Sequence, residues 1–134
     1  MRGGRVAGDD AHRRVLDALP EGLYVTDRER VITYWNQAAQ QITGYTPDEA
    51  IGRWCGDGFL NHVDDNGVVL CGSRCPLLAS IGDGQTRTVA ISLHHRDGHL
   101  VQVQVTASPL HDQGGQTVGA IETFHPVATA GDRS

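Results

Sequence analysis

Hydrophobic and polar residues alternate most regularly near the C-terminal end of the chain. In the segment 99–110, valines occupy every second position and polar residues fill the positions between them: Val101, Val103 and Val105 against Gln102, Gln104 and Thr106. Side chains of a strand point alternately to its two faces, so this pattern predicts a strand with one dry face and one wetter face.

Four further segments are also predicted to be strands. Residues 23–27 and 31–35 are rich in β-branched and aromatic residues and are separated by a short polar turn, so they are predicted to form a hairpin. Residues 87–95 lead through the turn Asp97-Gly98 into the valine-rich strand, and residues 117–125 form the last strand. We therefore expect an antiparallel sheet.

Short helices are predicted from capping signals rather than from long periodic runs. Asn36 precedes "QAAQQIT" and Gly44 follows it, while Thr46-Pro47-Asp48-Glu49 has the spacing of a capping box. Pro76 is suited to the first position of a further helix.

Residues 11–19 are predicted to form an N-terminal helix with one apolar stripe, made of His12, Val15, Leu16 and Leu19. So short a helix is marginal alone, and we expect the stripe to pack on its own sheet or on a partner. The order of helix, two strands, short helices and three strands predicts an α+β domain over 11–126. Residues 1–10 are expected to be disordered, and 127–134 resemble a linker or tail.

Composition and charge narrow the function classes. The chain has 134 residues and a formal net charge of −5 without a concentrated basic face, which argues against direct nucleic-acid binding. It has no apolar run of membrane-spanning length and no secretory signal, so we expect a cytoplasmic protein without membrane insertion. No catalytic Ser/His/Asp order or phosphate-binding loop is present, and we expect no enzymatic activity.

All three cysteines lie within one segment of twenty-one residues, together with one histidine: Cys55, His62, Cys71 and Cys75. Thiolate and imidazole are natural zinc ligands, and four of them make a closed structural site. An iron–sulfur cluster could use the same residues, because histidine can replace cysteine on iron. We therefore treat these four residues as a candidate metal or redox site.

A redox role for the cysteines is also open. If Pro76 begins a helix, Cys75 is its N-cap, where the helix dipole favours the thiolate. Cys71 lies four residues away and could pair with Cys75. The simplest alternative is that the cysteines are buried as small hydrophobic residues.

Two stretches of the sequence resemble the PAS domain, a small sensor module of signalling proteins. They are "LDALPEGLYVTDRERVITYWNQAAQQITGYTPDEAIGR" (16–53) and "HHRDGHLVQVQVTASPLHDQGGQTVGAIETF" (94–124). The resemblance implies a five-stranded antiparallel sheet with short helices on one face, often around a ligand cavity, and an N-terminal capping helix. In many PAS domains polar side chains of the valine-rich strand face the cavity, so the Gln102 and Gln104 face could be the ligand face instead.

The cysteine segment resembles a PAS variant often found beside GGDEF diguanylate cyclase domains, with Cys, "HVD", "LC" and "CPL" in this order. "GRWCGDGFLNH" partly resembles the flavin-adduct motif of light-sensing PAS domains. Trp54, Gly56 and Asn61 replace the residues that hold the flavin there, which argues against a flavin. Haem-binding PAS domains use a histidine, and only His62 suits that role here.

The sequence thus predicts a PAS sensory module that binds a small ligand, a cofactor or a metal. We expect it to signal as a homodimer or through a linked kinase, diguanylate cyclase or transcriptional regulator. Two alternatives stay open: a ligand-free dimerisation module, and a thiol redox switch that uses Cys71 and Cys75.

Overall fold

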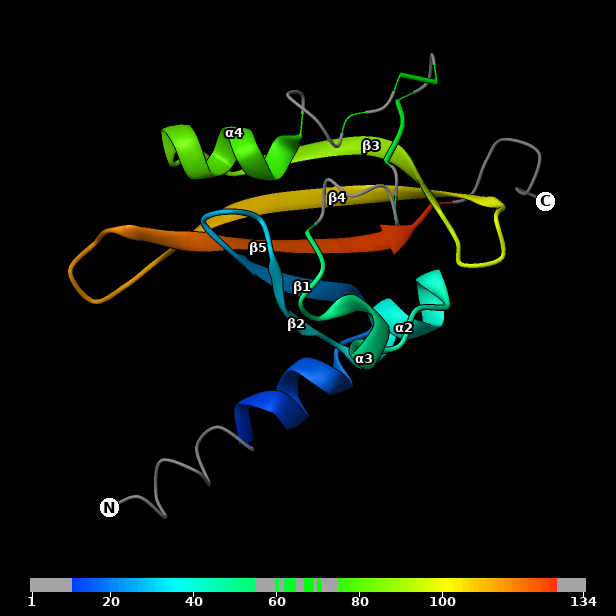
Figure 1. Cartoon of the computed structure of the whole chain (residues 1–134), viewed down its shortest axis with the longest axis horizontal. Helices are drawn as coiled ribbons and strands as arrows, with labels where there is room; N and C mark the ends of the chain where they lie inside the picture. The colour runs from blue at the N-terminus through cyan, green and yellow to red at the C-terminus, as the bar shows by residue number, and fades with distance from the viewer. Residues whose placement is uncertain are drawn as a thin grey trace.

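The computed structural model describes residues 11–54, 60, 62–64, 67–68, 70 and 75–127. Its centre is one antiparallel sheet of five strands in the order β2-β1-β5-β4-β3 (Figure 1). The strands are β1 (Gly22–Asp27), β2 (Ile32–Trp35), β3 (Arg87–His94), β4 (Leu100–His111) and β5 (Thr117–Pro126). The predicted five-stranded antiparallel sheet and the α+β class are confirmed.

The two faces of the sheet differ as the alternating pattern predicts. On β4, Val103 and Val105 are fully buried and Val101 is half-buried, whereas Gln102 and Gln104 are exposed. The inner face continues across the neighbouring strands through Phe124, Ile91 and other apolar side chains. The valine face is therefore the core face, and the glutamine face looks outward.

Helix α2 (Gln37–Thr43) begins where the sequence predicts. The Asn36 side chain accepts a hydrogen bond from the backbone N–H of Ala39, and Gly44 ends the helix at a φ of 83°. Asn36 is fully buried, and its amide also donates to the backbone carbonyls of Leu16 and Glu21. One side chain thus ties α2 to the end of the N-terminal helix.

Helix α3 (Pro47–Ala50) begins with the predicted capping box. The Thr46 side chain accepts from the Glu49 N–H, and the Glu49 carboxylate accepts from the Thr46 N–H at 2.9 Å. These reciprocal bonds satisfy backbone donors that a helix start leaves open. They fix so short a helix.

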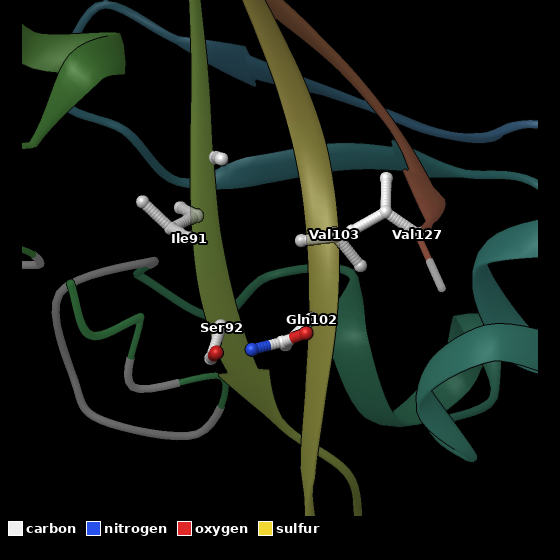
Figure 2. A pocket seen from close by; sticks show the side chains of 6 residues that line it. Ile91, Ser92, Gln102, Val103 and Val127 are labelled. Atoms are coloured by element: carbon white, nitrogen blue, oxygen red, sulfur yellow. The ribbon is translucent and has the colours of Figure 1, made fainter. Parts of the chain in front are cut away.

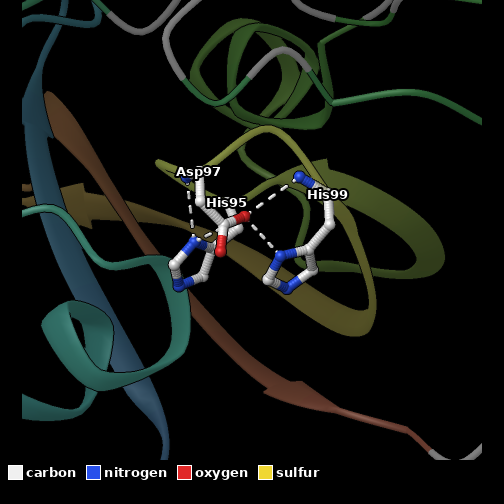
Figure 3. A group of neighbouring side chains, drawn as sticks. All are labelled: His95, Asp97 and His99. Carbon is white, nitrogen blue, oxygen red and sulfur yellow. Dashed lines mark hydrogen bonds and ion pairs between the residues drawn. The ribbon is translucent and has the colours of Figure 1, made fainter.

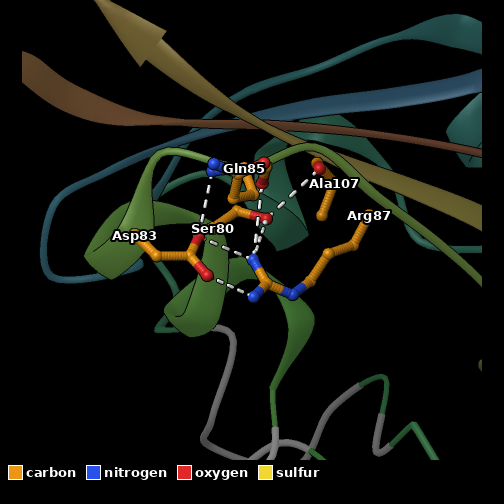
Figure 4. A network of polar contacts seen from close by, with 5 residues as sticks. All are labelled: Ser80, Asp83, Gln85, Arg87 and Ala107. Carbon is orange, nitrogen blue, oxygen red and sulfur yellow. Dashed lines mark hydrogen bonds and ion pairs between the residues drawn. The ribbon is translucent and has the colours of Figure 1, made fainter.

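Helix α4 (Pro76–Asp83) packs its buried side chains, Leu77, Ser80 and Ile81, toward the sheet. Its C-terminal end is held by a polar network in which Arg87 of β3 contacts the Asp83 carboxylate (Figure 4). The Ser80 hydroxyl donates to the Ala107 carbonyl of β4 at 3.3 Å. The network anchors α4 on the sheet and so fixes where its first residues lie.

The N-terminal helix spans 11–18 among the described residues and extends away from the sheet (Figure 1). Its C-terminal end is anchored, because Asp17 accepts hydrogen bonds from the Tyr34 hydroxyl and the Gln37 N–H, both at 3.0 Å. Burial and this carboxylate raise the pKa of Tyr34 to about 12. Of the apolar stripe, Leu16 and Leu19 are half-buried, whereas His12 and Val15 are exposed. Packing of the stripe on a partner therefore stays a prediction.

Candidate functional site

A buried carboxyl group on the central strand is the most unusual feature of the core. Glu122 of β5 is 2% exposed and lies opposite Tyr24 of β1 on one side and Ala107 of β4 on the other. Its neighbours on the same face of β5, Ala120 and Phe124, belong to the hydrophobic core. Glutamate is almost never fully buried without a compensating partner, so its presence here calls for a reason.

Two of the predicted site residues lie near this carboxyl group. His62 is buried, and its Nε2 lies 3.6 Å from Oε1 of Glu122. Cys75 is also buried, as the N-cap of α4, and is close enough to influence the Glu122 pKa. We call these four residues, Tyr24, His62, Cys75 and Glu122, the inner polar cluster.

The backbone explains how His62 reaches the core. β3 is an edge strand, and the segment around His62 pairs with its open edge. The Val63 N–H donates to the Ser92 carbonyl at 2.8 Å, and the Ser92 N–H donates to the Val63 carbonyl at 2.9 Å. Pairing of this kind satisfies the edge and directs alternate residues inward.

Burial sets the charge state of the inner polar cluster. Burial is the largest influence on the pKa of Glu122 and raises it to about 8. The Tyr24 hydroxyl lowers this pKa, and Cys75 raises it. Burial, reinforced by His94, lowers the pKa of His62 to about 4. Both groups are therefore uncharged at neutral pH, and their 3.6 Å separation is too long for a hydrogen bond.

A neutral glutamic acid differs chemically from a carboxylate. It carries one O–H donor and keeps acceptor oxygens, so it can donate a hydrogen bond to a polar ligand or accept one from it. Oε1 of Glu122 has no hydrogen-bond partner among the described residues. A buried polar atom in this state costs stability, and a ligand atom could satisfy it.

Only two residues of the predicted four-residue metal site, His62 and Cys75, lie among the residues that the structure describes. Cys55 and Cys71 lie outside the described residues, so their convergence with His62 and Cys75 stays a prediction. Imidazole, thiol and carboxyl groups suit zinc. Among the described residues, however, the group of three ligating side chains whose atoms lie within 4.8 Å of one another is a different one, His95, Asp97 and His99.

The prediction for the Cys75 thiolate agrees with the structure in the position of the residue but not in its contacts. Cys75 is the N-cap and Pro76 the first residue of α4, as predicted, but the Cys75 side chain makes no capping hydrogen bond to that helix. Proximity to the helix start thus does not by itself hold the sulfur against the open N–H groups.

Two hollows lie elsewhere on the surface. One of about 110 Å³ is lined by β3 and β4, where Ser92 and Gln102 lie side by side on paired strands (Figure 2). The other, of about 280 Å³, lies between the N-terminal helix, β2 and α3, and its lining includes Arg13 and Trp35. Neither is lined by a residue of the inner polar cluster.

Glu122 was not among the site residues predicted from the sequence, although a signal for it is present. In "GAIETF" the residues two positions before and after Glu122 are Ala120 and Phe124, which places the acid on the apolar face of its strand. Only the pairing with Tyr24 shows that this face is the inner one.

A model of the PAS fold matches residues 11–127 of the chain. The chain belongs to the PAS family. A solved PAS domain from Colwellia psychrerythraea has a similar fold, with a TM-score of 0.72 and 21% identity over 88% of this chain and 95% of that one.

Three curated relatives are signalling proteins. The bacterioopsin transcriptional activator of Halobacterium salinarum is 32% identical over 76% of this chain and 15% of its own length. The probable diguanylate cyclase DgcE of Escherichia coli is 28% identical, over 84% of this chain and 10% of its own. The histidine-protein kinase AtoS of the same organism is 30% identical, over 82% and 17%. The chain therefore spans less than a fifth of the length of each of these relatives.

None of the helices in the described segments combines the length and the apolar character that crossing a bilayer requires.

Proposed function

We propose that this PAS domain is a non-enzymatic, cytoplasmic sensory module whose inner polar cluster binds a small polar ligand. The proposal rests on one observation: Glu122 is buried on the central strand, beside buried His62, with an oxygen that no described residue satisfies. A core without a ligand would be more stable with an apolar residue at this position, because an unpaired buried polar group costs about 1–3 kcal/mol.

The route from this cluster to an output is short. Glu122 lies between β1 and β4, and β1 leads back to the N-terminal helix, whose end is held through Asn36 and Asp17. A ligand that engaged Glu122 would therefore act on the strand next to the element that leaves the domain. The relatives that join PAS segments to a kinase, a cyclase or a transcriptional activator support a linked output domain.

The ligand proposal is tested by mass and elemental composition. We expect native mass spectrometry of the purified protein to show an added mass that disappears on denaturation and is lost in Glu122→Gln. Glu29→Gln, a change at an exposed glutamate, is the matched control and should retain the added mass. A wild-type protein that carries neither an organic molecule nor a metal, and binds none from a library of polar metabolites, would contradict the proposal.

Metal remains a second ligand class, since Cys55 and Cys71 could complete a site with His62 and Cys75. Elemental analysis of anaerobically purified protein tests it, with His62→Ala as the decisive variant. Zinc or iron lost with that change supports the four-residue site. A metal-free protein in which Cys71 and Cys75 form a reversible disulfide supports the redox switch instead.

A homodimerisation module is the second candidate, and the exposed Val15 favours it. This side chain is 62% exposed on an otherwise anchored helix, and His12 beside it on the stripe is exposed too. A second copy of the chain would cover the stripe. Val15→Ser should then shift sedimentation toward the monomer, while Val118→Ser, at a similarly exposed strand position, should not; identical sedimentation of all three proteins would contradict this candidate.

A further inference from the structure

A second group of titratable side chains lies at the opposite extreme of exposure, in the turn between β3 and β4. His95, Asp97 and His99 converge there, with one ligand atom of each within 4.8 Å of the others (Figure 3). Nδ1 of His95 lies 3.2 Å from Oδ1 of Asp97, and Nδ1 of His99 contacts the same oxygen. The two imidazole rings stack with centroids 4.5 Å apart and planes inclined by 16°.

The backbone holds these side chains in place. The His95 N–H donates to the His99 carbonyl and the Gly98 N–H donates to the His95 carbonyl, both at 2.8 Å. Gly98 has a φ of 101°, a conformation that favours glycine and closes the turn. The Asp97 carboxylate accepts from the His99 N–H at 3.1 Å. The turn therefore brings the histidines face to face without help from a bound ion.

The base of the turn is also fixed to the helical layer. The Arg96 N–H donates to the Thr43 carbonyl at the end of α2, and the Arg96 guanidinium pairs with Glu49 of α3 at 2.7 Å. The His95 ring lies against Gly44, where an added Cβ would come within 2.7 Å of it. This contact restricts the more buried of the two rings.

The donor set is that of a transition-metal site. Two imidazoles and one carboxylate suit zinc, copper and nickel, whereas magnesium and calcium prefer oxygen ligands alone. Neighbouring ligand atoms around a metal with bonds of about 2.0–2.2 Å lie roughly 3–3.5 Å apart, so small rotations of the exposed Asp97 and His99 side chains suffice.

We propose that His95, Asp97 and His99 form a surface site for a divalent transition-metal ion of the zinc class, with water completing its coordination. The ion would bind at the Nδ1 edges of the two rings, in the ring planes. It would replace the hydrogen bond that Nδ1 of His95 accepts from the Asp97 N–H and the one between Nδ1 of His99 and the Asp97 carboxylate. It would cross-link the two ends of the turn beside the C-terminal end of α2. The site is independent of the inner polar cluster and of the function proposed for it.

Zinc titration followed by NMR tests the site at its own residues, so that zinc bound to the cysteine segment does not confuse the result. We expect the Cε1–H signals of His95 and His99 to shift together with zinc, at a stoichiometry of one ion per turn. His99→Ala should abolish the His95 shift. Asp97→Asn keeps the side-chain oxygen that accepts from the His99 N–H but removes the charge, and should weaken apparent affinity by at least about tenfold, the loss seen even for outer-shell partners of metal sites.

His111→Ala is the matched control, because His111 is an exposed histidine on β4 outside the turn. It should leave the zinc-dependent shifts of His95 and His99 unchanged. Zinc that shifts neither signal, or that binds the Asp97→Asn and His99→Ala variants as tightly as the wild type, would overturn the proposal.

Discussion

Histidine and an acidic residue meet both in the core and in the β3–β4 turn of this domain, and these two groups have opposite electrostatics. In the core, burial raises the pKa of Glu122 to about 8 and lowers that of His62 to about 4. In the β3–β4 turn, hydrogen bonds from His99 lower the pKa of Asp97. The residue types are similar, so the difference comes from the access of water.

The comparison also separates two kinds of ligand. The core pair is uncharged and suits a neutral polar ligand, while the exposed pair offers an anion and two imidazoles and suits a cation. Charge state follows from solvation, and ligand class follows from charge state.

The largest expected effect is a change in the pH dependence of stability when one core partner is removed. Between pH 4.5 and 8 the unfolded Glu122 has lost its proton and the folded one retains it, so each pH unit lowers the free energy of unfolding by about 1.4 kcal/mol. Between pH 4 and 6.5 the unfolded His62 is charged and the folded one is not. Each pH unit in this range therefore raises the free energy of unfolding by the same amount.

In the wild type these slopes oppose each other from pH 4.5 to 6.5, and stability then falls by about 2 kcal/mol from pH 6.5 to 8. His62→Gln should expose a continuous fall from pH 4.5 to 8, and Glu122→Gln should remove the fall above pH 6.5. Urea unfolding over this pH range measures both, with His111→Gln as control. A wild type whose stability does not fall between pH 6.5 and 8 would show that the folded core pair holds no proton in this range, and would contradict the charge states described here.

A smaller effect is expected from an uncharged change on β4. Val103→Ala removes two methyl groups from a fully buried position and should cost about 1–3 kcal/mol in the free energy of unfolding. Gln104→Ala, one position along the same strand, is exposed and should change stability little. Equal costs for both changes would mean that burial does not distinguish the two faces as described.

The smallest effect is expected at Asp97. A lowered pKa means that the carboxylate stabilises the folded state above its unfolded pKa and loses this contribution as the pH falls through the folded value. Asp97→Asn should therefore lose a small stabilisation at neutral pH. The difference from the wild type should disappear as the pH falls through the folded pKa of Asp97, where the wild-type carboxyl group is protonated as well. Acid unfolding followed by circular dichroism measures it. A loss of stability in Asp97→Asn that grows above pH 7 would contradict this assignment.

Much of the fold could be predicted because its signals are local. Asn36, Thr46 and Pro76 begin helices through interactions with residues three or four positions away, and the structure places all three helix starts as expected. The alternation on β4 identified its dry face for the same reason, since strand geometry puts every second side chain on one side.

The candidate sites were harder to predict because they depend on partners far apart in the chain. Cys75 and His62 were chosen for their chemistry, but the carboxyl group beside them comes from β5, sixty residues from His62. The turn at Asp97-Gly98 was predicted, but the closeness of His95 and His99 to Asp97 depends on the side-chain positions that the closed turn imposes.

The sequence by itself determined where strands alternate, where helices begin and that cysteine, histidine and acidic residues are present. Only the tertiary structure decided which of them water reaches. Burial between β1 and β4 makes Glu122 a neutral acid, and exposure in the turn keeps Asp97 an anion, because the free energy of a charge depends on the surroundings that the whole fold assembles.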